Sequence, residues 1–291
     1  MHSAGMQVAV VGIQGVPLSS IASYATYAQS VGMSVMWEIN DPGFWGGAWN
    51  GSSAAADWAG FSSACGCTAT GQVLDYMIRW LAALPATYGY YAADDWTLTA
   101  GQVAGLTQYV SEIRSDDPTH MVMVGSTQAQ GTTYYATGAT IGNEIYPETT
   151  SNLMPYGRNL ATWQSVQQSV EQDARAAKAH GEASAFLLQS FTFGDNIWDG
   201  EAVGACTAQM TQQQCASRLD FPSPAVQLEL RNQVLEHADP TLILWFNFQE
   251  TYGQGGRWAG LTRVINAPYP ATASVARAKR KARGVRRGRR Y

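Results

Sequence analysis

The feature that most constrains the fold of this chain is an alternation of short apolar runs with longer segments of helical periodicity. A short run rich in β-branched and aromatic residues is typical of a buried strand, whereas apolar positions three or four apart indicate a helix. The βαβα order predicts a parallel sheet covered by helices. The expected strands are residues 8–13, 34–39, 87–93, 121–125, 140–145, 185–191 and 242–248. The expected helices are residues 19–31, 71–84, 97–115, 160–180 and 224–238, with long loops at 41–70 and 192–223.

Length and composition favour one large α/β domain. The chain has 291 residues, 46% hydrophobic and 14% charged, which is enough apolar material for a single β/α barrel and argues against disorder. We therefore predict a (β/α)8 TIM barrel with seven strands visible in this chain. Because a closed barrel has eight strands, we expect the first strand and any signal peptide to lie upstream of Met1. An open doubly wound sheet is the alternative, but no Gly-rich phosphate loop follows the first strand.

The charge distribution separates the last residues from the rest. The net charge is −4, with 22 acidic and 18 basic residues, yet nine of the basic residues fall within 277–290. Residues 1–276 are therefore predicted to form the barrel domain, with a net charge of −13. Residues 277–291 are predicted to be a solvated, disordered tail, because like charges repel one another. The alternative is that the tail binds an anionic polymer, whereas the acidic body argues against a nucleic-acid enzyme.

The four cysteines favour an extracellular protein with disulfides. Cys206 and Cys215 close a short polar loop, which suits a disulfide. Cys65 and Cys67 are one residue apart, so a bond between them is expected to be strained. The spacings fit no zinc motif, and the scattered histidines suggest no metal site, so we expect no metal and no cofactor. The segment of residues 1–6 is too short and too polar for a signal peptide. No apolar stretch of the sequence is long enough to span a membrane.

Acidic residues close several of the apolar runs. Glu38, Glu144 and Glu250 each end such a run, and the run at 87–93 is followed by Asp94 and Asp95. A carboxylate is costly at the edge of an apolar core unless a partner holds it. In a parallel barrel the carboxyl ends of the strands form the active-site face. Acids that recur there predict a hydrolytic site.

The order of these segments resembles the glycoside-hydrolase-like TIM barrels of the broad glycosidase superfamily. The resemblance covers about residues 7–250 and implies that the visible strands are numbers two to eight. It rests on 84–96 with its Asp94–Asp95 pair, on 115–120 with the strand after it, on 141–147 with Glu144 before Tyr146, and on 186–191, 228–231 and 242–248. Two positions depart from the pattern. The second acid of the pair is Asp95 rather than Glu, and Gln189 stands where retaining members carry a nucleophilic Glu.

Glycosidic cleavage generally needs two carboxyl groups, one protonated and one ionised. We predict Asp95 and Glu144 as the catalytic pair, since both fall at strand ends. Asp94 is expected to shift the pKa of its neighbour, because like charges push pKa values apart. The alternatives are a turn or capping pair for Asp94–Asp95 and a structural ion pair for Glu144. The predicted substrate-binding residues are Asp94, Glu38, Trp45, Trp96, Tyr146, Gln189 and Glu250.

Three functions remain open from the sequence. The first is a secreted glycoside hydrolase that cleaves a polysaccharide or oligosaccharide. The second is a non-catalytic carbohydrate-binding barrel at the cell surface, which the two departures favour. The third is a surface-associated structural protein anchored by its basic tail. Ten Trp and fourteen Tyr fit sugar stacking, because pyranose C–H faces pack on aromatic rings, although core packing accounts for the same composition.

Overall fold

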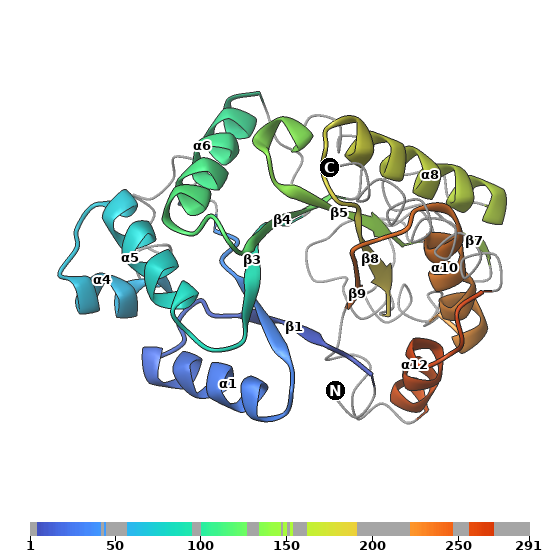
Figure 1. The fold of residues 1–291 in the computed structure, drawn as a ribbon, viewed down its shortest axis with the longest axis horizontal. Coiled ribbons are helices and arrows are strands. Elements are labelled where there is room, and N and C mark those ends of the chain that lie inside the picture. Colours follow the sequence, from blue (N-terminus) through green and yellow to red (C-terminus); the bar gives the residue numbers. More distant parts are fainter. Residues whose placement is uncertain are drawn as a thin grey trace, which may run out of the picture. The chain divides into compact units, whose positions relative to one another are not determined.

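The computed structural model describes residues 5–41, 44, 57–94, 100–126, 134–146, 148–149, 152–153, 162–190, 222–246 and 256–270. The chain divides into two compact units, residues 1–142 with 180–182 and residues 143–179 with 183–291. Both units contain parallel strands and helices, as Figure 1 shows. The fold is therefore α/β, as the sequence predicts.

All seven predicted strands are present, and their order along the sheet follows the chain. Hydrogen bonds connect them in the order β1-β2-β3-β4-β5-β8-β9. The registers of β1 with β2, β2 with β3, β3 with β4 and β8 with β9 are parallel, as a β/α barrel requires. The strands are β1 (Val8–Gly12), β2 (Ser34–Glu38), β3 (Thr87–Ala93), β4 (Met121–Ser126), β5 (Thr140–Ile145), β8 (Ala185–Gln189) and β9 (Leu242–Phe246).

The five predicted helices are also present, and the described residues contain two further helices that were not predicted. The predicted ones are α1 (Leu18–Ser30), α5 (Thr70–Ala82), α6 (Ala100–Asp116), α8 (Trp163–Ala179) and α10 (Pro224–His237). The prediction of an uninterrupted loop at 41–70 is wrong, because α4 (Ala59–Cys65) lies within it. Three further features were not predicted, namely α12 (Arg257–Ile265), the 3-10 turn Tyr135–Thr137, and the antiparallel pair β6 (Glu148–Thr149) and β7 (Asn152–Leu153).

Burial explains why α4 forms in a stretch of small residues. The seven-residue helix carries Phe61, which is 2% exposed and packs against fully buried Trp58. Trp58 in turn donates from Nε1 to a carboxylate oxygen of Asp41 at 2.5 Å. A short helix gains little from its own backbone, so this tertiary packing stabilises it where the sequence pattern is weak.

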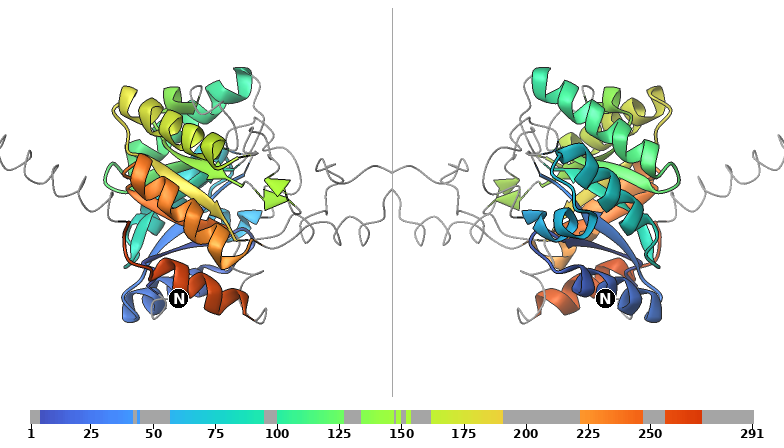
Figure 2. Two further views of the ribbon diagram at one scale, coloured as in Figure 1. Left: turned by 90° about the vertical axis from the view of Figure 1, so that its right-hand side faces the viewer. Right: turned by 90° about the vertical axis from the view of Figure 1, so that its left-hand side faces the viewer.

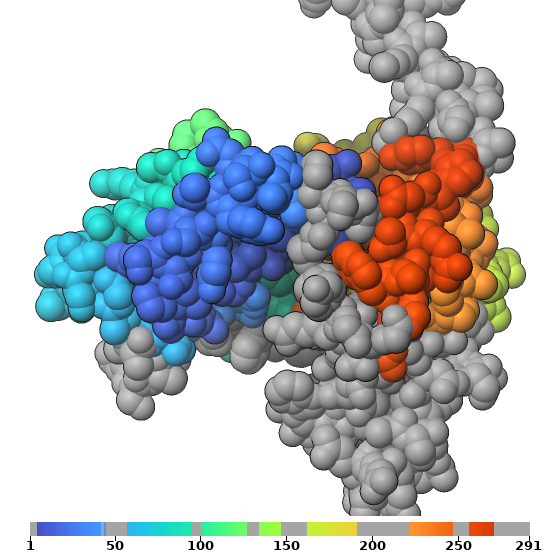
Figure 3. Space-filling model, turned by 90° about the horizontal axis from the view of Figure 1, so that it is seen from below, coloured from blue at the N-terminus to red at the C-terminus, as the bar shows by residue number. Residues whose placement is uncertain are grey.

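The core of the first unit lies between its strands and α1, α5 and α6. Trp37 of β2 is fully buried and donates from Nε1 to Thr87 Oγ1 at 3.0 Å. Trp37 is therefore a core residue and is not available to stack on a sugar. The outer surface of α1 is exposed (blue in Figure 3), and Tyr27 on that helix is 70% exposed.

The core of the second unit fixes which face each strand residue uses. Ile145, Phe186 and Leu188 pack in one buried cluster with side chains of α8 and α10. These two helices lie side by side over β8, as the views in Figure 2 show. Because consecutive strand residues point to opposite faces, Glu144, Leu187 and Gln189 point away from the two helices. In a β/α barrel that face is the interior.

A buried carboxylate organises the turn between α6 and β4. Asp117 is 3% exposed and accepts hydrogen bonds from Tyr90 Oη at 2.7 Å and from Thr119 Oγ1 at 2.7 Å. His120 Nδ1 lies 2.5 Å from Oδ2, the oxygen that accepts from Tyr90, and the backbone N–H groups of Thr119 and His120 donate to Oδ1. Burial alone would raise the pKa of Asp117, but these hydrogen bonds outweigh it and lower the pKa well below 3.8.

We expect Asp117→Asn to destabilise the protein by about 2 kcal/mol at neutral pH, because donors that now face a carboxylate would face an amide. A depressed folded pKa contributes stability that is complete above the unfolded pKa of about 3.9 and is lost as pH falls through the folded value. The parent should therefore approach the variant as pH falls below about 4. Urea unfolding between pH 2 and pH 7 measures this, and a pH-independent difference would contradict it.

Among the described residues, no helix is long and apolar enough to cross a membrane.

Candidate active site

In the first unit, two carboxylates lie at the ends of adjacent strands. Glu38 is the last residue of β2 and pairs in register with Tyr91 of β3, while Asp94 follows the end of β3. On the other side, Glu38 pairs with Gly12 of β1. A Cβ at Gly12 would lie 3.4 Å from Glu38 Oε2, so the absence of a side chain there leaves room for the carboxyl group. The structure thus brings together two of the predicted binding residues.

The environment of Glu38 favours its protonated form. Burial raises the pKa of Glu38, and the charge of nearby Asp94 raises it further. Asp94 itself accepts a hydrogen bond from the hydroxyl of Tyr91. A glutamic acid that keeps its proton above the usual range can donate a hydrogen bond or a proton, which is the property that carboxylate pairs in hydrolytic sites use.

We expect unfolding to report the proton on Glu38 directly. A raised folded pKa contributes stability below the unfolded pKa of about 4.3 that is lost as pH rises through the folded value. Glu38→Gln should therefore be more stable than the parent at pH 7, with the gain absent near pH 4. Asp94→Asn should move the loss of stability to lower pH, because it removes the charge but leaves the burial. Urea unfolding from pH 4 to pH 8 tests both, and unchanged profiles would contradict the assignment.

In the second unit, Glu144 lies near the end of β5 and is 3% exposed. Its neighbour Asn143 donates from Nδ2 to the carbonyl of Ala185 at 3.2 Å, which connects β5 with β8. Every residue of β5 is buried, so the strand is covered on both faces. Glu144 therefore presents a carboxyl group on the face away from α8 and α10, at the end of the strand where a barrel places its chemistry.

Two other predicted binding residues are buried in the same unit. Gln189 is the last residue of β8 and is fully buried. The next residue, Ser190, donates its backbone N–H to the carbonyl of Phe246 at 2.5 Å. Tyr146 is 6% exposed, and its ring centroid lies 6.5 Å from that of Phe246. Both side chains are thus at strand ends, as expected, but packing holds the ring of Tyr146.

The remaining predicted site residues lie outside the described residues. They are Asp95, Trp45, Trp96 and Glu250, and the same is true of Cys206 and Cys215. Within the described ranges, no three metal-binding side chains gather into a group.

The residues that hold the segment after β2 were not predicted from the sequence. Asp41 is 5% exposed and accepts the hydrogen bond from Trp58. Tyr109 of α6 donates from its hydroxyl to the carbonyl of Ile39 at 2.9 Å, and its ring stacks on Phe44. These contacts fix the chain that leaves the end of β2. The sequence signal for them is an aspartate, Asp41, two residues after the predicted strand 34–39.

Comparison with known proteins finds matches at the level of structure alone. No protein-family model and no curated protein matches the sequence. A cellulose synthase subunit Z from Clostridioides difficile aligns with a TM-score of 0.55 and 10% identity, over 91% of this chain and 89% of that one. A broad-specificity GH5-4 endoglucanase from Clostridium longisporum aligns with a TM-score of 0.51 and 10% identity, over 91% and 83%.

This chain has a glycosidase-like TIM-barrel fold. The predicted fold class and the resemblance to glycoside hydrolase barrels are thus confirmed. A third neighbour, a beta-D-glucuronidase from Dictyoglomus thermophilum, aligns at 12% identity with a TM-score of 0.48 over 82% of this chain, which spans 38% of the enzyme's length. At these identities the glycosidase-like barrel shares the fold of its neighbours, and its chemistry has to be argued from its own residues.

Proposed function

We propose that the chain is a glycoside hydrolase that cleaves O-glycosidic bonds of a polysaccharide or oligosaccharide. The observation that carries this proposal is the pair Glu38 and Asp94 at the ends of β2 and β3, where burial and the charge of Asp94 raise the pKa of Glu38. A carboxyl group with a raised pKa beside a second carboxyl group is the arrangement that hydrolytic sites use for acid–base chemistry. The fold supports the proposal, because barrels of this kind place their active sites at the carboxyl ends of the strands.

The proposed catalytic residues are Asp95 and Glu144, as predicted from the sequence. One acts as the general acid that protonates the leaving oxygen, and the other acts as base or nucleophile. Glu38 and Asp94 are proposed to bind sugar hydroxyl groups, with protonated Glu38 as a hydrogen-bond donor. Extracellular action and adhesion of residues 277–291 to an anionic polymer are further parts of the proposal, and no nucleic acid, metal or cofactor enters it.

Release of reducing sugar across a panel of polysaccharides tests the proposal. The parent is compared with Asp95→Asn and Glu144→Gln, each shown to be folded by its unfolding transition. The proposal expects release by the parent and loss of release in both variants. If the folded parent released sugar from none of the polysaccharides in the panel, that result would contradict the proposal.

The second candidate is a carbohydrate-binding barrel without catalysis. The observation that favours it is Gln189, which is fully buried at the end of β8, where retaining relatives of the resembled family carry a nucleophile. An amide cannot form a glycosyl-enzyme bond, so retaining chemistry at this position is excluded, whereas an inverting mechanism needs no nucleophile. Binding of a glycan without turnover would favour this candidate.

A further inference from the structure

A cavity of about 550 Å³ lies on the first unit, between the end of α4 and the exposed side of α5. Its size is in the range of small-molecule binding sites. It contains neither Glu38 nor Asp94, so it is separate from the strand-end carboxylates. The residues that line this cavity indicate which class of ligand it would accept.

The floor of the cavity consists of two parallel stripes on α5. Gln72, Tyr76 and Trp80 follow one another at intervals of four residues, and Asp75 and Arg79 form the adjacent stripe. Side chains four residues apart lie on the same helix face. The other faces of α5 carry its buried residues, so the helix is held by its core while this side remains open. Aromatic and hydrogen-bonding groups thus alternate along one surface.

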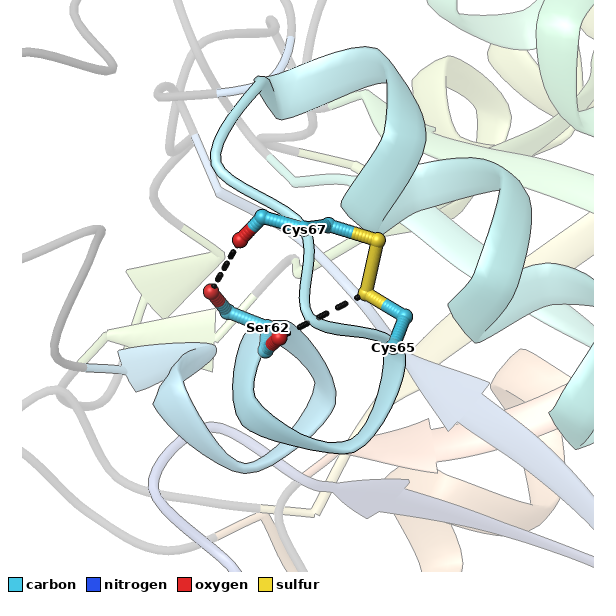
Figure 4. Close-up of a disulfide and its surroundings, with 3 residues drawn as sticks. All are labelled: Ser62, Cys65 and Cys67. Carbon is cyan, nitrogen blue, oxygen red and sulfur yellow. Dashed lines mark hydrogen bonds between the residues drawn. A yellow bond between two sulfur atoms is a disulfide. The ribbon is translucent and has the colours of Figure 1, made fainter.

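The wall of the cavity is the turn formed by Cys65, Gly66 and Cys67, which follows α4. A disulfide joins the two cysteines, as Figure 4 shows. Ser62 holds the Cys67 end of the turn with two hydrogen bonds, because its hydroxyl donates to the carbonyl of Cys67 at 2.7 Å and its carbonyl accepts the backbone N–H of Cys67 at 3.0 Å. Gly66 has φ +66°, which a side chain would strain. The wall is therefore preorganised.

The ring of Trp80 is fixed from behind. Its centroid lies 5.6 Å from that of Phe61 in an edge-to-face arrangement, and Phe61 packs on Trp58. Trp80 is only partly buried and lines the cavity, so one side of the indole remains available. A rigid ring with an available face binds a flat apolar ligand surface without losing side-chain entropy.

The charges around the cavity favour an uncharged ligand. Arg79 is already paired, since its Nη2 lies 2.6 Å from Asp116 Oδ1, and burial together with the charge of nearby Asp116 raises the pKa of Asp75. Glu112 adds a further acidic group near Asp75. The cluster of Asp75, Arg79, Asp116 and Glu112 therefore carries more negative than positive charge, which opposes an anionic ligand. Carboxylate, guanidinium and amide groups are, however, suitable partners for hydroxyl groups.

We propose that this cavity is an auxiliary binding site for a neutral oligosaccharide, with a pyranose ring stacked on Trp80 and its hydroxyl groups bonded to Gln72 and Asp75. The choice of carbohydrate as the ligand class rests on the proposed function. The site holds a neutral glycan chain at the surface of α5, which Glu38 and Asp94 do not line.

Affinity electrophoresis of the full chain tests this proposal. Native gels contain a neutral polysaccharide (hydroxyethyl cellulose, xyloglucan or galactomannan) or the anionic polygalacturonate. The variants are Trp80→Ala and the double variant Gln72→Ala with Tyr76→Ala, which keeps the contact between Trp80 and Phe61. Tyr27→Ala is the matched control, because Tyr27 is an exposed tyrosine of α1 outside the cavity. We expect binding of at least one neutral polysaccharide, weakened about tenfold in both cavity variants and unchanged in the control.

The outcomes separate this site from the proposed hydrolase. Loss of binding in the cavity variants supports the site even if the parent releases no sugar, in which case the proposed function alone fails. If the parent is active, turnover of a short soluble aryl glycoside should be the same in Trp80→Ala as in the parent. Three outcomes would each overturn the proposal. They are equal retardation of the parent and both cavity variants, retardation of the parent by polygalacturonate alone, and no retardation of the parent by any neutral polysaccharide.

Discussion

Glu144→Gln is expected to lower the rate of glycan hydrolysis by about 10²–10⁴-fold, which is the usual contribution of a general acid or base. The substitution replaces one carboxyl oxygen by an amide and leaves the size of the side chain almost unchanged. Because Glu144 is 3% exposed and points away from the cluster around Ile145, the change removes chemistry without opening the apolar core. The measurement is the initial rate of reducing-sugar release under saturating substrate.

The matched control for this variant is Glu182→Gln, a partly exposed glutamate between α8 and β8 that lies outside the strand ends. It should keep the full rate. Binding of the glycan by Glu144→Gln should also persist, since the variant is expected to lose the proton transfer and not the sugar contacts. A rate above a tenth of the parent's for folded Glu144→Gln would contradict a catalytic role and return Glu144 to a structural one.

The second large effect is expected from Gly89→Ala, a change of one methyl group in the middle of β3. A Cβ at Gly89 would lie 2.3 Å from the backbone oxygen of Met121 and 3.0 Å from its carbonyl carbon. Gly89 pairs with Met121 of β4 and with Met36 of β2, so the strand cannot move aside without breaking registers on both sides. We expect a destabilisation of about 4 kcal/mol, at the upper end for a single substitution.

Gly101→Ala is the control for this variant, because nothing lies within 4 Å of a Cβ at that position in α6. It should be neutral or stabilise slightly, since alanine favours a helix more than glycine does. Thermal unfolding of the two variants beside the parent measures the difference. A melting temperature of Gly89→Ala within 2 °C of the parent's would show that the sheet adapts and would contradict the steric argument.

The fold follows from the sequence because its strands are long enough and apolar enough to be recognised singly. Every residue of 140–145 and of 185–189 is buried, which agrees with the prediction of a buried strand for each run. The two missed helices are short, with seven residues in α4 and nine in α12. α4 depends on Phe61 and Trp58, whose partners come from distant parts of the sequence. Local propensity cannot report such contacts.

The candidate site was predicted only in part. The reason is again that its residues interact with residues distant in the sequence. The position of Glu38 and Asp94 at strand ends was readable from the sequence, but their mutual effect was not. Glu38 was expected to bind substrate, whereas the structure adds a pKa raised by burial and by Asp94. The roles of Asp95, Trp45, Trp96 and Glu250, which lie outside the described residues, stay predictions.

The sequence by itself determined the order of strands and helices, the parallel α/β class and the placement of acids at the strand ends, because each of these is encoded within a few consecutive residues. Only the tertiary structure decided that the pKa of Glu38 is raised, and that an indole, a disulfide-bonded turn and the carboxyl group of Asp75 line one cavity on α5. Those properties arise from burial and from contacts between residues distant in the chain, which a linear pattern does not record.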